Sequence, residues 1–205
     1  AHTIAQLKAI NNALTGQLTL NDYTVALSGS SADVAAALNG TFAATYTGTA
    51  ATNNAHTLAQ LKTINNGTSG TITLNDVTVA LSGSTADVKA ALAGTFAVGY
   101  SGNVTLGDAN GTGIAATDIS TIAGDTSGTV TVTNNINITG TSAAITTAVA
   151  DVNSFSGTPT AALGDAHTLA QLKAINNALT GELTLTDYTV ALSGSSADVS
   201  AALDG

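Results

Sequence analysis

The sequence AHTIAQLKAINNALTGQLTLNDYTVALSGSSADVAAALNG (residues 1–40) returns as AHTLAQLKAINNALTGELTLTDYTVALSGSSADVSAALDG (residues 166–205). The two copies differ at five of forty positions, and a third copy, AHTLAQLKTINNGTSGTITLNDVTVALSGSTADVKAALAG, begins at Ala55. Internal repetition of this kind is typical of arrays in which each unit buries its apolar face against its neighbours. Because near-copies duplicate one shape, the pattern favours a repeated scaffold over a single catalytic constellation.

The copies divide the chain into four repeat units that form one continuous array. The third unit is degenerate and the fourth partial, and the four units cover residues 1–54, 55–112, 113–165 and 166–205. Each unit of about 54 residues contains two half-units of about 27, and each half-unit reads as a helix, a glycine and a strand. This period predicts an α/β repeat fold, a solenoid of stacked helix-strand half-units with a parallel β-sheet. The degenerate unit places Ile119 on Leu61 and Gly128 on Gly70.

Local motifs predict where the helices and strands lie. The first helix of a unit begins with a T-x-x-Q capping box, at Thr3, Thr57 and Thr168. The second helix begins with an S-x-x-D variant at Ser30 and ends at an Asn-Gly pair. Aliphatic residues alternate with threonine, as in half-buried strands, at 18–20, 72–74, 130–132 and 183–185. Residues 23–27 are expected to form a further strand or a bent continuation after the turn at Asn21 and Asp22.

Composition narrows the classes of function. The chain has a net charge of −9, four lysines, no arginine and 8% charged residues, against about 25% in typical soluble domains. Phosphate recognition depends on clustered Arg and Lys, so nucleic acid and anionic membrane surfaces are poor partners. No apolar run approaches the roughly 20 residues of a membrane span, so no membrane insertion is expected. The absence of cysteine excludes a disulfide scaffold and thiolate sites.

The joint absence of Cys, Met, Trp and Arg is typical of an oxidation-resistant chain that is thrifty in sulfur and nitrogen. It favours an extracellular or cell-surface location. No signal peptide opens the chain, which starts without Met at a repeat boundary and stops partway through a unit. We therefore expect a section of a longer protein whose targeting signals lie elsewhere.

The repeated titratable residues are candidate sites, each with a structural alternative. His2, His56 and His167 precede the first helix of their units, where a row of imidazoles suggests metal binding or pH sensing. Two strand spacings, roughly 10 Å, separate neighbours, so one ion cannot bridge them, and packing is the favoured interpretation. Two sets of aspartates have helix-dipole or turn roles, which explain them without a catalytic pair: Asp33, Asp87 and Asp198, and Asp22, Asp76 and Asp187.

One loop departs from the repeat. In GDANGTG (residues 107–113), Asp108 and Asn110 offer side-chain oxygens between glycine carbonyls and are the candidate calcium ligands. The loop lacks the closing Glu of an EF-hand and the G-G-x-G-x-D pattern of calcium β-rolls, so an ordinary Gly/Asn loop is the alternative. No other cofactor is expected.

An aromatic-[Ser/Thr]-Gly triplet recurs at Tyr46, Tyr100 and Phe155. Aromatic rows can stack on sugars, but the replacement of Tyr by Phe in the third triplet favours packing at a turn.

The motifs T-x-A-Q-L-K-x-I-N-N, G-x-[ILV]-T-[LV] and L-S-G-S-[ST]-A-D-V-x-A-A-L resemble repeat modules of very large secreted surface proteins of bacteria, notably cyanobacterial and marine ones. The resemblance covers nearly the whole chain and is weakest over 107–165. It implies a role in stalks, adhesins, surface layers or matrix, and it brings no active site with it.

Three functions compete at this stage. The first is a non-catalytic structural segment of an extracellular filament, surface layer or adhesin stalk, which assembles end to end with copies of itself or with neighbouring repeats. The second is a binding module whose Thr, Asn and aromatic rows recognise glycans or another surface, with or without calcium. The third, an enzyme, is disfavoured because the acids are copied in every unit.

Overall fold

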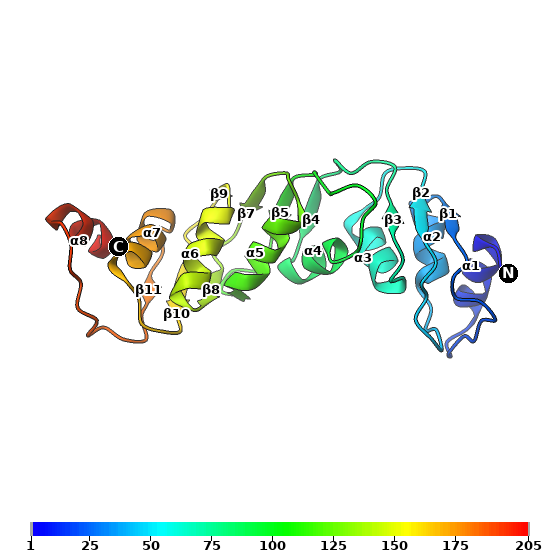
Figure 1. The fold of residues 1–205 in the computed structure, drawn as a ribbon, viewed down its shortest axis with the longest axis horizontal. Coiled ribbons are helices and arrows are strands. Elements are labelled where there is room, and N and C mark those ends of the chain that lie inside the picture. The colour runs from blue at the N-terminus through cyan, green and yellow to red at the C-terminus, as the bar shows by residue number, and fades with distance from the viewer. Residues whose placement is uncertain (1, 205) are drawn as a thin grey trace. The chain divides into compact units, whose positions relative to one another are not determined.

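The structure, a computed structural model, describes residues 2–204 and has an α/β fold (Figure 1). Within this range the chain forms eight helices and three parallel sheets. The chain divides into two compact units. The first takes the described residues up to Ser82 with Ala86–Asn103 and Asp125–Gly128, and the second takes Gly83–Thr85, Val104–Gly124 and the described residues from Thr129 onward. The four repeat units remain an assignment from the sequence, since the two compact units do not follow their boundaries.

The first compact unit opens with a three-stranded parallel sheet in the order β1-β2-β3. One helix follows each of the first two strands, and another precedes the sheet. The elements are α1 (Ile4–Ala13), β1 (Leu27–Gly29), α2 (Ser31–Leu38), β2 (Ala50–Thr52), α3 (Leu58–Gly67) and β3 (Ile72–Thr73). Their core is aliphatic and includes Leu7, Leu27, Val34, Leu38, Ile64 and Ile72, together with the ring of Tyr46.

The chain continues through β4 (Leu81–Gly83) and α4 (Thr85–Leu92). The second compact unit then carries strands of two parallel sheets in alternation. Its elements are β5 (Val104–Leu106), β6 (Gly113–Ala115), α5 (Ala116–Asp125), β7 (Val130–Val132), β8 (Asn137–Gly140), α6 (Ser142–Asp151), β9 (Ser154–Phe155), β10 (Thr160–Leu163), α7 (Leu169–Ala178), β11 (Leu183–Thr184) and α8 (Ser196–Leu203). One sheet has the order β11-β10-β8-β6, and in the other β7 lies between β5 and β9.

Neighbouring strands pair in register at a nearly constant offset along the sequence. Leu27 pairs with Ala50, Val104 with Val130, and Ala161 with Leu183, so partners lie 22 to 26 residues apart across all pairs. A helix lies between each pair of neighbouring strands, as parallel pairing requires a crossover. The parallel pairing predicted from the half-unit pattern is therefore confirmed, but the strands form three sheets where a single sheet was predicted.

The predicted helix starts are confirmed. Each T-x-x-Q motif forms a capping box at the N terminus of α1, α3 and α7, in which the threonine side chain accepts from the N3 amide and the glutamine side chain accepts from the cap amide. At α2, the Ser30 side chain accepts from the Asp33 amide at 3.1 Å, and Asn39 forms the C-cap. These motifs act within one turn, so the local sequence is enough to place them.

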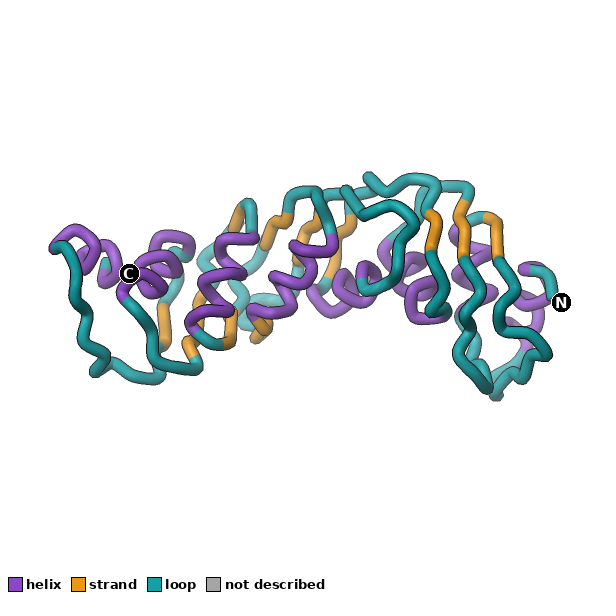
Figure 2. Tube along the Cα trace, viewed as in Figure 1, coloured by secondary structure: helices purple, strands orange, loops and turns teal. Residues whose placement is uncertain are grey.

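The strand predicted at 130–132 is confirmed as β7, whereas the other predicted strands are longer than the observed ones: β3 and β11 end one residue before the predicted ends at 74 and 185. The segment 18–20 makes only an isolated bridge between Leu18 and Phe42, and the strand expected at 23–27 starts at Leu27. In that segment the Asp22 side chain accepts from the amide and the hydroxyl of Thr24, a local turn that replaces ladder bonds. The strands are consequently short and are joined by long loops (Figure 2).

Residues that the sequence alignment of the degenerate unit places together have similar environments. Ile119 and Leu61 are both fully buried. A Cβ added to Gly70 would lie 2.4 Å from the carbonyl oxygen of Gly48, and one added to Gly128 would lie 2.4 Å from that of Gly102. Both glycines therefore sit where two backbones touch. No helix formed by residues 2–204 has the length and apolarity to cross a membrane.

Candidate functional site

A hydrogen-bonded cap recurs at the second helix of the repeat. At α2, the amide and the hydroxyl of Ser31 both donate to Oδ1 of Asn54, at 2.8 and 2.7 Å. At α6, Ser142 makes the same two bonds to Oδ1 of Asp165, at 2.6 and 2.7 Å. The first amides of a helix have no intrahelical partner, so an acceptor placed 23 residues along the chain satisfies one of them and anchors the loop that carries it.

Asp108, the first candidate calcium ligand, occupies the same position at α4. Its carboxylate accepts from the amide of Thr85 at 2.9 Å (Oδ2) and 3.1 Å (Oδ1) and from the Thr85 hydroxyl at 2.5 Å. The Asp108 side chain is buried, with the residue 9% exposed. The structure therefore places this carboxylate against a helix N terminus, where negative charge is favoured.

Asn110, the second candidate, uses its side chain elsewhere. Its Oδ1 accepts from the amide of Asn135 at 2.9 Å, and the amide of the following Gly111 donates to the Asn135 carbonyl at 2.7 Å. Gly111 has φ = +78°, which a glycine adopts at no steric cost. No group of three or more His, Cys, Asp or Glu side chains suited to a metal is present among residues 2–204. A calcium role for Asp108 and Asn110 stays a prediction.

Two of the repeated histidines bind the repeated tyrosines. His2 Nε2 lies 3.0 Å from the Tyr46 hydroxyl, and His56 Nε2 lies 3.1 Å from the Tyr100 hydroxyl. Each hydroxyl donates to a backbone carbonyl: the Tyr46 hydroxyl to that of Val25 at 2.6 Å, and the Tyr100 hydroxyl to that of Val79 at 2.5 Å. Since the hydroxyl proton is committed there, the imidazole must be the donor through Nε2–H.

This tautomer explains the one unpaired atom of the buried pair. His56 Nδ1 is buried and has no partner among the described residues, and the same holds for Nδ1 of His167. In the Nε2–H tautomer Nδ1 carries a lone pair, so protonation would place an N–H⁺ where no acceptor lies. Burial lowers the pKa of His56 and of His2, and burial raises the pKa of Tyr46 to about 12.

The two triplets that carry tyrosine owe their glycine to the same contact, whereas the glycine of the third, Gly157, faces the side chain of Asn135. A Cβ on Gly48 would lie 2.1 Å from the carbonyl oxygen of Val25, and a Cβ on Gly102 would lie 2.1 Å from that of Val79. Only glycine lets this carbonyl approach closely enough to accept from the tyrosine hydroxyl. The tyrosines are buried, which fits the packing interpretation and leaves no ring face for a sugar. Sequence reasoning missed this pairing, although both histidines lie 44 residues before their tyrosines.

The repeated aspartates also make local or short-range contacts. Lys8 pairs with Asp33 at 2.5 Å, Lys173 with Asp198 at 2.6 Å, and Lys62 with Asp87. The lysine hydrogen bond lowers the pKa of Asp33 and of Asp198. In the other set, the hydroxyl and amide of the threonine two residues on lower the pKa of each carboxyl: Asp22, Asp76 and Asp187. These surface contacts contribute little stability, because water screens them.

One polar groove lies in the first compact unit. It encloses about 730 Å³ beside the C-terminal ends of α2 and α3 and is lined by amide and hydroxyl side chains that include Asn39, Thr63, Asn66 and Ser69. Its charged lining residue, Lys62, is paired with Asp87. The groove offers hydrogen-bond donors and acceptors without a nucleophile-base pair, so it fits a neutral polar ligand better than it fits catalysis.

Comparisons of the chain with protein-family models, with curated proteins and with solved structures gave no match.

Proposed function

We propose that the chain is a non-catalytic structural repeat segment of an extracellular filament, surface layer or adhesin stalk. In this proposal the helix-strand half-units stack as a solenoid, as the sequence repeat predicts. One observation carries it: the residues that an active site would use make the same scaffold contact in successive repeats. The clearest case is the cap, which joins Ser31 to Asn54, Thr85 to Asp108, and Ser142 to Asp165.

The repeated histidines support the same conclusion. His2 and His56 are held as hydrogen-bond donors to buried tyrosines, and burial lowers the pKa of both imidazoles. A general base needs a reachable substrate proton, and His56 is buried with its Nε2 committed to Tyr100.

The secreted setting rests on composition and on the resemblance to bacterial surface-protein repeats. The absence of Cys and Met, whose sulfur atoms are readily oxidised, suits a chain exposed to oxidants. Association with further repeats end to end is supported by β11, an edge strand of its sheet. An edge strand presents unpaired backbone groups that another segment can complete.

Electron microscopy of the purified chain at micromolar concentration, with and without calcium, tests the proposal. Rods that lengthen when two or three copies of the chain are fused in tandem support a solenoid, and filaments from the single chain add non-covalent assembly. Compact particles whose length does not grow with added repeats would overturn it.

A glycan-binding module is the second candidate, favoured by the polar groove beside α2 and α3. Its walls are amides and hydroxyls, which can exchange hydrogen bonds with sugar hydroxyls. A glycan array followed by titration of an Asn66→Ala variant tests it. Binding that Asn66→Ala abolishes supports the candidate, and an empty array removes it.

A further inference from the structure

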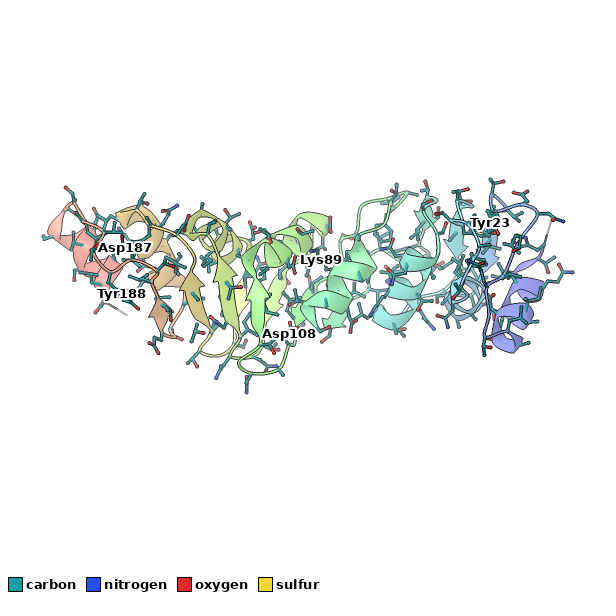
Figure 3. The ribbon with its side chains drawn as sticks, turned by 90° about the horizontal axis from the view of Figure 1, so that it is seen from below. Tyr23, Lys89, Asp108, Asp187 and Tyr188 are labelled. Carbon is teal, nitrogen blue, oxygen red and sulfur yellow. The ribbon has the colours of Figure 1, made fainter. Side chains whose placement is uncertain are left out.

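The two nearly identical copies 1–40 and 166–205 have different surroundings. In the first copy Leu38 is 2% exposed, whereas its counterpart Leu203 is 62% exposed. Tyr23 is half-buried, whereas its counterpart Tyr188 is 73% exposed (Figure 3). Since the local sequence is the same, the difference identifies a surface that is covered in one copy and open in the other.

Two segments cover this surface in the first copy. One is α3, where a Cβ added to Gly67 would lie 2.6 Å from the Cβ of Leu38, and the other is the segment that carries Phe42. Phe42 forms a parallel bridge with Leu18: the Leu18 amide donates to the Thr41 carbonyl at 2.8 Å, and the Ala43 amide donates to the Leu18 carbonyl at 2.9 Å. The ring of Phe42 meets the ring of Tyr23 edge-on, with centroids 6.5 Å apart. The segment that carries Phe42 is TFAATY (residues 41–46), which makes one parallel bridge to Leu18 and places the Phe42 ring against Tyr23.

A second instance has the same geometry. The Ile72 amide donates to the Thr95 carbonyl at 2.8 Å, and the Ala97 amide donates to the Ile72 carbonyl at 2.9 Å. The segment here is TFAVGY (residues 95–100), so both occupants share the pattern T-F-A-x-x-Y. The same sequence pattern thus covers the same edge twice.

The open copy is already shaped to receive this pattern. The Leu185 amide donates to the Tyr188 hydroxyl at 3.3 Å, as the Leu20 amide does to Tyr23 at 3.0 Å, so the ring is held without its partner. A groove of about 370 Å³ runs past Leu183, Leu185, Tyr188 and Leu203. Glu182 is the one charged residue among residues 2–204 that lines this groove, so the groove suits an uncharged occupant.

The backbone edge of the open copy also matches. Ala161 pairs with Leu183, and the Ala161 amide donates to the carbonyl of Glu182 at 3.2 Å. In a parallel ladder successive residues direct their amide and carbonyl to opposite sides, so those of Leu183 point away from β10. These are the groups that Leu18 and Ile72 use to bind their Phe segments.

We propose that the face formed by Leu183, Leu185, Tyr188 and Leu203, the Tyr188 face, binds an extended T-F-A-x-x-Y segment by strand addition. The occupant is a partner defined by this sequence, whose Phe ring packs edge-on against Tyr188 and whose backbone pairs with Leu183. The inference rests on the proposed function, because it names the contact through which repeats associate at this face.

The probe is a synthetic peptide with the sequence of residues 41–54, TFAATYTGTAATNN, titrated into the ¹⁵N-labelled full chain. We expect binding with a Kd on the order of 100 µM, since one ring and two backbone bonds offset the ordering of a flexible peptide. Shifts should centre on Leu183, Tyr188 and Leu203. Replacing the peptide Phe by Ala should weaken binding by at least about tenfold. N-methylation of the following Ala, which removes the amide that bonds the strand carbonyl, should also weaken it.

Two protein variants and one fusion complete the test. Leu203→Asp should abolish binding, whereas Val98→Asp, also at an exposed position (64%), should leave it unchanged. Fusing TFAATYTGTAATNN after Gly205 should protect the Leu183 amide from exchange, and the same fusion with Phe replaced by Ala should not. The proposal is overturned if the peptide does not bind and the fusion gives no protection, or if the peptide binds elsewhere. Sedimentation showing a dimer through the Tyr188 face that the peptide does not displace would also overturn it. Rod-like particles in microscopy without peptide binding would retain the proposed function and remove only this partner.

Discussion

Substitutions at Asp108 distinguish a helix-capping role of this residue from a calcium-binding role. Its carboxylate is the acceptor for both the amide and the hydroxyl of Thr85, which is 2% exposed. Asp108→Ala would leave two buried donors without a partner, and such donors cost about 1–3 kcal/mol. We expect a loss of about 2 kcal/mol at the α4 N terminus. Asp108→Asn should cost less than about 1 kcal/mol, because the single amide oxygen of Asn54 serves Ser31 equally and only the helix-dipole attraction is lost.

Hydrogen exchange at the Thr85 amide is the assay, since repeat arrays can open locally and a global transition would average the effect. A loss of about 2 kcal/mol corresponds to roughly 30-fold faster exchange. Asn54→Ala is the matched control and should accelerate exchange at Ser31 alone. Calcium ligation predicts a different order, in which Asp108→Asn behaves like Asp108→Ala in calcium and chelation has no further effect on either variant. If the Asn variant is as damaging as the Ala variant, the capping argument is refuted.

Three further predictions concern the His56–Tyr100 pair. Tyr100→Phe should destabilise the protein by about 1–3 kcal/mol in urea titrations. The double variant with His56→Ile should lose clearly less stability than the sum of the two single variants, because each partner alone leaves the other unsatisfied. Additive losses would show that the two side chains do not interact. Gly102→Ala should lower the free energy of unfolding by at least about 1 kcal/mol, because its Cβ would lie 2.1 Å from the Val79 carbonyl oxygen. Gly99→Ala should lower it far less, since no atom of residues 2–204, apart from its chain neighbours, lies within 4 Å of that Cβ. Equal thermal shifts of the two variants would contradict the steric argument. Burial lowers the pKa of His56 from its ordinary value of 6.5, so below that pH the unfolded chain binds a proton that the folded chain does not. The free energy of unfolding should therefore fall as the pH drops from 6.5, and the fall should be shallower in the His56→Ile, Tyr100→Phe double variant. An identical pH profile of the double variant would exclude His56 as the source of the fall.

The sequence predicted the contacts that act over three or four residues. The capping boxes at Thr3, Thr57 and Thr168 need only a threonine and a glutamine three positions later. The pairing of parallel strands was also predictable, because parallel strands need a crossover connection and a helix between consecutive strands supplies one.

Strand ends and the polar contacts between repeats could not be predicted in the same way. Whether 18–20 forms a strand depends on a partner at Phe42, and the partner offers only one bridge. The cap that holds Asp108 depends on Thr85, 23 residues earlier, and a loop insertion after Asp108 hid its equivalence to Asn54. Without that equivalence, the side-chain oxygens of Asp108 suggest a metal ligand. The signal was present as a hydroxyl residue 23 positions before Asn54, Asp108 and Asp165.

Differences among the repeats show what the scaffold requires at each position. The cap acceptor is Asn54 in one repeat and Asp108 or Asp165 in others, so the requirement is an oxygen and not a charge. In the degenerate unit, Ile114 stands where His56 does in the sequence alignment, and the aromatic triplet carries Phe155 in place of a tyrosine. These two side chains do not form an equivalent pair, because Ile114 lies on β6 beside β8 and Phe155 lies on β9 beside β7.

Losing both members of the His–Tyr pair removes the donor and its acceptor together, which avoids an unsatisfied buried group. The degenerate unit, residues 113–165, contains neither a histidine nor a tyrosine and still forms helices and parallel strands. The His–Tyr pair is therefore not needed for the helix-strand pattern, which supports a function that resides in repeated shape.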